Sequence, residues 1–230
     1  MKYDNVKEAI FLERPNRFVA VVLVDGVEEK VHVKNTGRCE ELLVNGIKVA
    51  LTGSDNPNRK TKYDLISVFS PDYGWVNIDS QAPNELFREW LSSEGNDLLP
   101  DVDYIKPECQ FGESRIDYYL EKDDRKILVE LKGCTLQKLG MGYFPDAPSE
   151  RAVKHLREMI EARKEGYECF IAFAIQMNGI THVMPNRTLD PDFADALRDA
   201  IKSGVRILNL RCMVKRDEVV IESYGTIDYL

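Results

Sequence analysis

Three side chains able to support metal-dependent chemistry lie close together along the chain: Asp117, Glu130 and Lys132. Carboxylate pairs suit hard divalent cations such as Mg2+, which bind oxygen ligands and keep water in their remaining positions. A lysine beside such a cation can orient the attacking water or help to deprotonate it. An aspartate followed by Glu-x-Lys on the next strand is therefore typical of metal-dependent phosphodiester cleavage.

A β-hairpin would bring these residues together. The segments Arg115–Leu120 and Lys126–Leu131 alternate apolar and polar residues with a period of two, and they flank the polar segment Glu121–Arg125. A turn centred on Asp123 and Asp124 keeps the apolar residues of both strands on one face, whereas an odd-numbered loop would not. The sequence therefore predicts two adjacent antiparallel strands joined by this turn.

In that register Asp117 lies opposite Glu130, and Lys132 lies on the same face of the second strand. Two carboxylates that face each other repel and destabilise a sheet unless a positive charge lies between them. Lys132 is one candidate for that charge, and a divalent cation, Mg2+ or Mn2+, is a stronger one. The alternative is a solvated sheet face whose charges compensate one another.

The composition is that of a soluble globular protein, with 230 residues of which 43% are hydrophobic and 30% charged. This length suffices for one large domain or two small ones. No stretch is long enough to span a membrane, and Met1–Ile10 carries charges where a signal peptide needs an apolar core, which predicts a cytoplasmic protein. The five cysteines form no Cys-x-x-Cys pair, so neither a disulfide framework nor a zinc site is indicated.

The net charge of −8 counts against nucleic-acid binding, because phosphate contacts need a concentrated positive surface. The distribution of charge matters more than its sum, and the loops of the first third are locally basic. Phosphate-contacting loops are one interpretation of these residues, and exposed turns with solvated charges are the other. The residues that would contact nucleic acid there are Lys34, Asn35, Arg38, Asn56, Arg59, Lys60 and Lys62.

Residues 1–82 are predicted to form an all-β domain. Asp25-Gly26 is the clearest hairpin turn of this region. About five strands in this space favour an OB-like barrel, although a small β-sandwich would give much the same pattern. The strand-like segments are Arg17–Leu23, Glu29–Val33, Ile47–Leu51 and Tyr63–Val68.

The pattern then changes, and we place a domain boundary near Ser80–Pro83, which leaves residues 83–230 for a second domain. Pro83–Leu91 has the apolar spacing of a helix, on which Glu89 is either an additional metal ligand or a solvated side chain. Strand-like Tyr104–Phe111 follows this helix and precedes the hairpin.

Residues 133–148 are rich in Gly and Pro and predict an irregular loop. Ser149–Lys164 is the clearest helix, with Ser149 as its N-cap and Glu150 as a further candidate metal ligand. A cationic cluster near the start of this helix would either attract phosphate or be solvated; it consists of Arg151, Lys154, His155 and Arg157, of which the first three are candidate nucleic-acid contacts.

The continuous apolar run Cys169–Gln176 is typical of a central strand covered on both faces. Asp190 is expected to cap the next helix, which ends at Lys202. Val205–Val214 and Glu218–Glu222 close the chain as strands. Together these elements predict a mixed sheet with helices on its flanks.

The most distinctive segments are Arg17-Phe18, Asn35-Thr36-Gly37, Asn56-Pro57, Arg59-Lys60, Pro83-Asn84, Ser114-Arg115-Ile116-Asp117, Val129-Glu130-Leu131-Lys132, Phe144-Pro145-Asp146-Ala147, Ser149-Glu150-Arg151, Lys154-His155-Leu156 and Arg211-Cys212. In these segments the chain resembles the sugar fermentation stimulation protein A family over nearly its whole length. The resemblance implies an N-terminal OB-like β-barrel, a C-terminal PD-(D/E)xK nuclease-like α/β domain with a mixed sheet, and DNA binding.

The resemblance also implies that Asp117 and Glu130 are metal ligands and that Lys132 is the catalytic lysine, with Ile116 standing where the superfamily pattern has proline. The implied function is DNA binding with divalent-metal-dependent phosphodiester hydrolysis. One alternative is a non-catalytic DNA-binding regulator of sugar (maltose) metabolism genes, and another is an interaction module that acts through a second protein. The choice between single- and double-stranded DNA or RNA, and the formation of a homo-oligomer, are left open.

Overall fold

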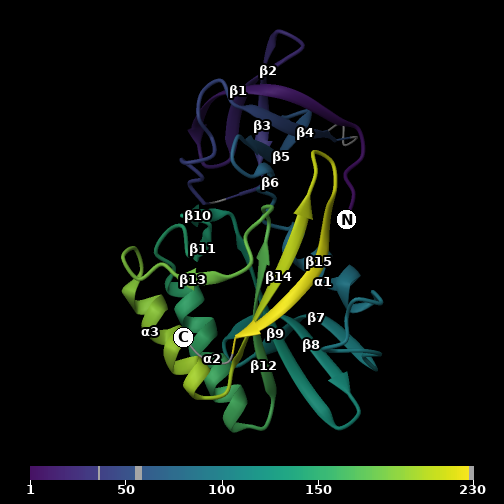
Figure 1. The fold of residues 1–230 in the computed structure, drawn as a ribbon, viewed down its shortest axis with the longest axis vertical. Helices are drawn as coiled ribbons and strands as arrows, with labels where there is room; N and C mark the ends of the chain where they lie inside the picture. The colour runs from purple at the N-terminus through teal and green to yellow at the C-terminus, as the bar shows by residue number, and fades with distance from the viewer. Residues whose placement is uncertain (36, 55–58, 228–230) are drawn as a thin grey trace.

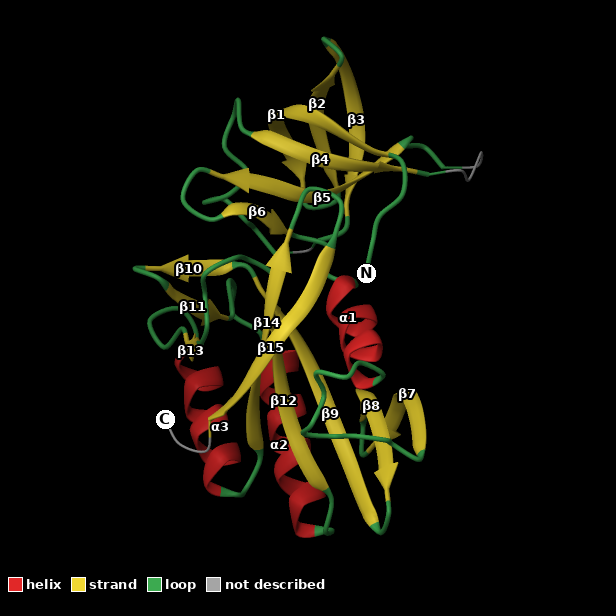
Figure 2. Ribbon diagram, turned by 45° about the vertical axis from the view of Figure 1, so that its right-hand side comes forward, coloured by secondary structure: helices red, strands yellow, loops and turns green. Residues whose placement is uncertain are grey.

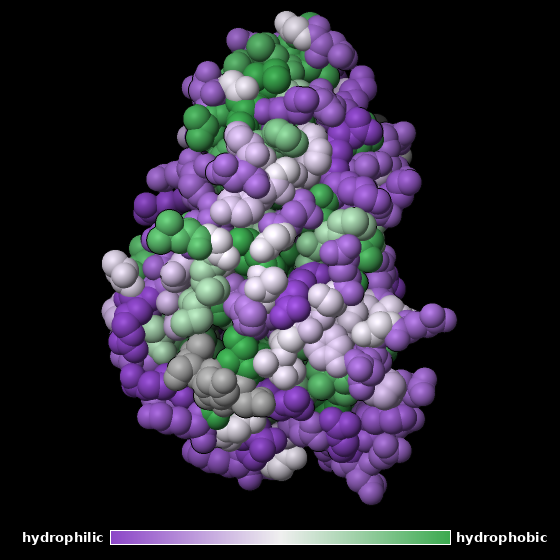
Figure 3. Space-filling model, viewed as in Figure 1, coloured by the Kyte–Doolittle hydropathy of each residue, from purple (hydrophilic) through white to green (hydrophobic). Residues whose placement is uncertain are grey.

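A β-barrel and an α/β domain lie end to end along the long axis of the molecule (Figure 1). We describe residues 1–35, 37–54 and 59–227 from a computed structural model. Among these residues no helix is long and apolar enough to cross a membrane. In Figure 3 the hydrophobic residues of one face form separate patches, the clearest at the tip of the barrel, within a mostly hydrophilic surface.

The barrel has the strand order β3-β2-β1-β4-β5-β6, and an additional pairing of β3 with β5 closes its five main strands. The OB-like barrel predicted from the sequence is therefore confirmed, and the alternative sandwich is wrong. The closing pair is parallel, whereas the other neighbours are antiparallel. The strands are β1 (Val6–Asn16), β2 (Val19–Val24), β3 (Val27–Val33), β4 (Lys48–Gly53), β5 (Tyr63–Ser70) and β6 (Gly74–Asn77).

Two local features explain why the barrel closes. The turn at Asp25-Gly26 has positive φ at both residues, 52° and 82°, which suits the tight hairpin between β2 and β3. Along β2 the side chains of Ala20, Val22 and Val24 are buried at every second position, so that one face of the strand lines the barrel core.

The sheet of the second domain is mixed, as predicted, with the order β15-β14-β12-β9-β8-β7. Strand β12 runs parallel to both β9 and β14, and the outer strands are antiparallel. Every residue of β12 after Glu168 is buried, because helices cover both faces of the sheet. The strands are β7 (Tyr104–Phe111), β8 (Ser114–Lys122), β9 (Arg125–Cys134), β12 (Glu168–Ile175), β14 (Arg206–Val214) and β15 (Val219–Ile227).

Helix α1 (Ala82–Leu91) covers one face of this sheet, whereas α2 (Glu150–Lys164) and α3 (Pro191–Lys202) cover the other (Figure 2). Both caps predicted from the sequence are confirmed. The Ser149 hydroxyl accepts a hydrogen bond from the Ala152 amide at 3.2 Å, and the Asp190 carboxylate accepts one from the Phe193 amide at 2.9 Å. The second carboxylate oxygen of Asp190 accepts a hydrogen bond from the Ser149 amide at 2.9 Å, which ties the starts of α2 and α3 together.

The irregular loop predicted for residues 133–148 instead contains strands β10 (Leu136–Lys138) and β11 (Met141–Phe144). Between them Leu139 and Gly140 both adopt positive φ, 53° and 77°, in a two-residue turn. Strand β11 also pairs in parallel with β13 (Val183–Pro185), which completes a small three-stranded sheet beside the barrel.

Hydrogen bonds from the end of β12 join the two domains. The amide nitrogen Nε2 of Gln176 donates to Asn77 Oδ1 at 2.6 Å and to the Asp79 carbonyl at 3.0 Å. Asn178 donates to the Tyr73 carbonyl at 3.0 Å. One apolar cluster also continues from the barrel core into the core between the large sheet and α2.

Candidate active site

The hairpin of β8 and β9 turns where the sequence predicts. Asp123 and Asp124 form its two-residue turn, with φ of 50° at Asp123. The ladder then runs from this turn to Tyr118 opposite Val129. These pairs confirm the register that brings Asp117 next to Glu130.

The ladder ends one pair before Asp117 and Glu130. The carboxylate oxygen Oδ2 of Asp117 accepts a hydrogen bond from the Leu131 amide at 2.8 Å. In a continued ladder a backbone carbonyl of β8 would accept the hydrogen bond of this amide. Here the Asp117 side chain accepts it instead. The predicted strand pair is replaced by a side-chain contact that still ties Asp117 to the strand that carries Glu130.

Glu130 is buried, with a relative exposure of 2%, on the face of β9 that packs against α2. Its oxygen Oε1 accepts hydrogen bonds from Lys132 Nζ at 2.6 Å and from the imidazole Nδ1 of His155. Its other oxygen, Oε2, is buried and has no hydrogen-bond partner among the described residues. Because a buried carboxylate oxygen without a donor is costly, it is expected to have a ligand in the working protein.

Burial, together with the negative charge of Glu130, raises the pKa of Asp117 to about 6. Burial alone would also raise the pKa of Glu130, but the positive charge of Lys132 and the hydrogen bond from His155 outweigh it, so that this pKa is lowered. Glu130 is thus stabilised as an anion, and Asp117 is the acid of the pair that resists ionisation.

These two carboxylates are the only predicted metal ligands that the structure brings together. Among the described residues, no three His, Cys, Asp or Glu side chains gather closely enough to hold a metal ion. Glu89 lies on α1, across the sheet from Glu130, where it pairs with the terminal amino group of Met1. Glu150 is exposed at the start of α2 and lines the same depression as His155.

That depression has a volume of about 440 Å3 and lies between the start of α2 and the start of β8. Of its cations, Lys154 pairs with Glu113 at 3.1 Å and Arg115 pairs with Glu108 at 3.4 Å. Because both pairs are exposed, their carboxylates compete only weakly with a bound phosphate. The side chains that line it are Glu113, Ser114, Arg115, Glu150, Arg151, Lys154 and His155.

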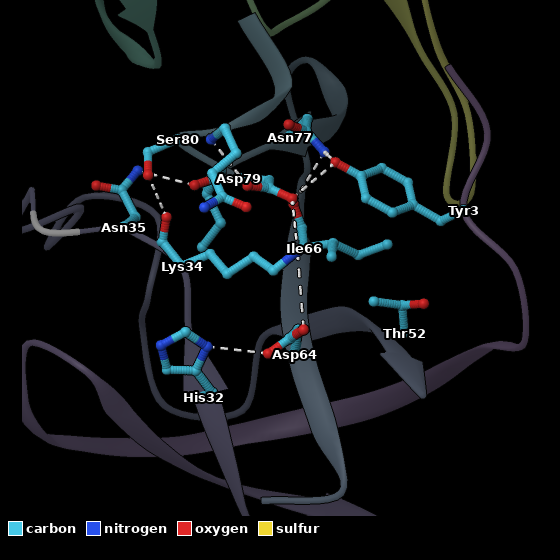
Figure 4. Close-up of polar contacts among 12 residues, drawn as sticks. Tyr3, His32, Lys34, Asn35, Thr52, Asp64, Ile66, Asn77, Asp79 and Ser80 are labelled. Atoms are coloured by element: carbon cyan, nitrogen blue, oxygen red, sulfur yellow. Dashed lines mark hydrogen bonds and ion pairs between the residues drawn. The ribbon is translucent and has the colours of Figure 1, made fainter. Parts of the chain in front are cut away.

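The basic residues predicted in the barrel are largely engaged with carboxylates. Figure 4 shows the Lys34 ammonium between Asp64 and Asp79, at 3.7 and 3.3 Å from their oxygens. Arg59 pairs with Asp64 through both terminal nitrogens, and Asn35 donates to a backbone carbonyl of the segment between the domains. These side chains therefore hold the barrel together and tie it to the segment that leads into the second domain.

The other predicted contacts of the barrel are more accessible. Arg38 and Lys60 are exposed, and Lys62 is exposed while pairing with Glu29 at 2.9 Å. Asn56 lies outside the residues that the structure describes.

Two residues have roles that the sequence does not predict. His155 lies on the inward face of α2, with 3% exposure, and contacts Glu130 instead of solvent. Arg14 donates to the carbonyls of Asn35, Gly37 and Arg38 at 2.6–2.8 Å and so fixes the loop that carries Arg38. Helical spacing indicates that residue 155 faces inward, whereas nothing in the sequence singles out Arg14.

Comparisons with known proteins agree with this domain plan. Residues 12–78 match a family model described as SfsA N-terminal OB domain, and residues 81–218 match one described as sugar fermentation stimulation protein RE domain. A sugar fermentation stimulation protein homolog of Desulfitobacterium hafniense is 49% identical over 99% of this chain and 98% of its own length. The homolog of Ruminiclostridium cellulolyticum is 46% identical over 96% of this chain and 97% of its own.

A solved structure of Pyrococcus furiosus SfsA in complex with Ca2+ superposes with a TM-score of 0.88. The two sequences are 29% identical, and the superposition covers 97% of this chain and 96% of the other. The arrangement of both domains is therefore shared with that protein.

Proposed function

Because the chain belongs to the sugar fermentation stimulation protein family, with an OB domain followed by a restriction-endonuclease-like domain, we propose that it binds DNA and hydrolyses DNA phosphodiester bonds with a divalent cation. The observation that carries this proposal is the buried Oε2 of Glu130, which has no hydrogen-bond partner in the part of the chain that the structure describes. Nothing in folding requires such an oxygen beside a second carboxylate, whereas a cation site does.

Asp117 and Glu130 are the residues that would hold the cation, Mg2+ or Mn2+. Two protein carboxylates fit these ions, because water and substrate phosphates commonly complete their coordination. Pyrococcus furiosus SfsA has been solved with Ca2+, which also takes oxygen ligands, and this supports a site of the same ligand type here. When bound, such a cation supplies charge that stabilises the phosphodiester transition state and acidifies water.

Lys132 is the group proposed to orient the attacking water. Its Nζ lies 2.6 Å from Glu130 Oε1, and its side chain keeps 15% exposure, so that it reaches both the acidic pair and solvent. The cations Arg115, Arg151 and Lys154 around the adjacent depression would attract the phosphates on either side of the scissile bond.

Cleavage is the direct test of this proposal. End-labelled single- and double-stranded DNA is incubated with the full chain and Mg2+ or Mn2+, beside Lys132→Ala purified in parallel and a chelator control. We expect cleavage that the chelator abolishes and that Lys132→Ala slows by about 100-fold or more, as for loss of a proton-transfer group. Equal cleavage by wild type and variant would identify a contaminating nuclease and contradict the assignment.

One observation favours a second candidate function, that of a DNA-binding regulator without catalysis. Glu130 is only 2% exposed and already contacts Lys132 and His155, as would be expected if the acidic pair stabilised a nuclease-like domain that served binding only. DNA binding without cleavage in either metal would support this candidate over the first.

The proposed binding of DNA by the barrel can be tested separately from cleavage. Replacing exposed Arg38 and Lys60 with alanine should weaken DNA association and flatten the plot of log affinity against log salt, by about one unit of slope for each lost phosphate contact. Fluorescence anisotropy with labelled DNA measures this slope. The matched control replaces Lys202 and Lys215, which are exposed on the second domain, and should leave the slope unchanged. An unchanged slope in the Arg38 and Lys60 variant would exclude that surface.

A further inference from the structure

His155 is a buried polar side chain on a helix face that is otherwise apolar. Its neighbours along the inward face of α2 are Ala152, Val153, Leu156 and Met159, all buried. An aliphatic side chain would fit this pattern, and a buried imidazole is tolerated only because it has hydrogen-bond partners. The identity of residue 155 therefore needs a reason beyond packing.

The imidazole has a partner at each ring nitrogen. Nδ1 contacts Glu130 Oε1, and Nε2 lies 3.4 Å from Nε of Arg151. A guanidinium group can only donate hydrogen bonds, so Nε2 is the acceptor and the proton lies on Nδ1, which donates to Glu130. Arg151 is exposed at the surface, whereas His155 is not.

The hydrogen bond from His155 Nδ1 helps to fix the orientation of the Glu130 carboxylate. Rotation about the terminal bond of a glutamate is soft, so one donor alone does not fix which oxygen it receives. Here Lys132 and His155 approach the same oxygen, Oε1, from β9 and from α2. Their combined pull leaves Oε2 without a donor among the described residues.

We propose that His155, oriented by Arg151, is a positioning residue that turns Glu130 so that Oε2 is available to a divalent cation. The proposal rests on the metal site put forward above and adds a residue that acts through Glu130 without touching the cation. His155 is too deeply buried to bind a DNA phosphate directly, with 3% exposure. Partners that orient a ligand in this way commonly account for about 10- to 100-fold in metal affinity.

The test measures Mn2+ binding to the full chain by calorimetry in the absence of DNA, with thermal unfolding of the metal-free protein recorded for every variant. His155→Leu removes the hydrogen-bond donor and places an apolar side chain in the buried position. We expect it to weaken Mn2+ binding by about 10- to 100-fold. His155→Asn places an amide N–H close to the position of Nδ1 and should keep the affinity within about threefold of wild type. Met159→Leu, an inward substitution of similar volume on the same helix, is the control and should bind as wild type does.

The outcomes separate this proposal from the proposed function. Wild type that does not bind Mn2+ would overturn both. Tight binding by wild type and by folded His155→Leu would overturn the role of His155 and leave the metal site standing. An equal loss of Mn2+ affinity in His155→Leu and His155→Asn would also overturn the proposed role of His155, because a hydrogen-bond donor at this position would then make no difference.

A further variant covers the case in which His155→Leu does not fold. Arg151→Met changes an exposed side chain and removes the group that orients the imidazole. Weaker Mn2+ binding at an unchanged unfolding temperature supports the proposal, and unchanged binding refutes it.

Discussion

Glu130→Ala should abolish divalent-cation binding and lower the free energy of unfolding by about 3 kcal/mol. The substitution removes the carboxylate that pairs with Lys132 and that accepts the hydrogen bond of His155 Nδ1, and these two side chains are only 15% and 4% exposed. Breaking a buried pair on one side is costly because the remaining groups lose their compensation and stay desolvated. Glu130 thus carries a structural and a proposed catalytic role in one side chain.

Two measurements on the same samples check this expectation: calorimetric titration with Mn2+ and unfolding in urea. The matched control is Glu168→Ala in the same sheet, which removes the partner of Arg125 at a site where the two side chains are 31% and 39% exposed. Solvent screening should hold its effect to about 1 kcal/mol or less, with Mn2+ binding unchanged. Undiminished Mn2+ heat in Glu130→Ala would rule out this residue as a ligand.

Asp117→Asn should have the opposite effect on stability, raising the free energy of unfolding of the metal-free protein at neutral pH by on the order of 2 kcal/mol. Burial, reinforced by the charge of Glu130, raises the pKa of Asp117 to about 6, so that ionising it in the folded protein is unfavourable. Asparagine has the same shape, carries no charge, and can still accept the hydrogen bond of the Leu131 amide. The variant should nevertheless bind Mn2+ poorly, because it lacks one carboxylate.

The raised pKa of Asp117 also predicts how the free energy of unfolding changes with pH. A raised carboxyl pKa means that the folded protein retains a proton which the unfolded chain has lost, between the ordinary value of 3.8 and about 6. The contribution of Asp117 to stability is therefore most favourable below this window, falls as pH rises through it, and is fully unfavourable above it. The asparagine variant should lack this dependence.

Urea unfolding with a chelator, at about pH 4 and about pH 7.5, measures the difference between wild type and Asp117→Asn. The stabilisation should be small at the lower pH and large at the higher one. An equal difference at both pH values would show that the charge of Asp117 is not its origin. A variant that is more stable yet cannot bind metal would fit a site whose charge repulsion is tolerated for function.

Local patterns in the sequence predict those parts of the fold whose causes are local. The turn at Asp123 and Asp124 and the caps Ser149 and Asp190 are formed as expected, because each depends on a few neighbouring residues. The continuous apolar run of β12 (Glu168–Ile175) is likewise a buried central strand.

Elements that depend on distant partners were not predicted. Strand β1 (Val6–Asn16) is the longest of the barrel, but two register irregularities interrupt its pairing with β2 and blur the alternation in its sequence. Strand β11 (Met141–Phe144) lies in a segment with glycine and pairs with β13 (Val183–Pro185) far along the chain. Neither the pairing of β1 nor that of β11 can be recognised from the order of apolar and polar residues along the strand itself.

The same distinction holds for the candidate site. The spacing of Asp117, Glu130 and Lys132 is a property of one hairpin, and their proximity could therefore be predicted. The contact of His155 with Glu130 depends on how α2 packs on the sheet. The pairing of Arg59 with buried Asp64 likewise depends on barrel closure, and the sequence alone shows only a basic loop.

The hydrogen bonds of Gln176 to Asn77 and to the Asp79 carbonyl make the spacing between the two domains a fixed dimension of the molecule. These bonds attach the end of the central strand of the large sheet to the base of the barrel, and with the contacts of Asn178 and the shared apolar cluster they restrain the two domains relative to each other. A strand gripped by the barrel would consequently meet the acidic pair at a set contour length, and the flexibility needed to reach it would have to come from the nucleic acid. The contacts of Gln176 and Asn178 would then set the distance along the nucleic acid between the site of binding and the site of cleavage.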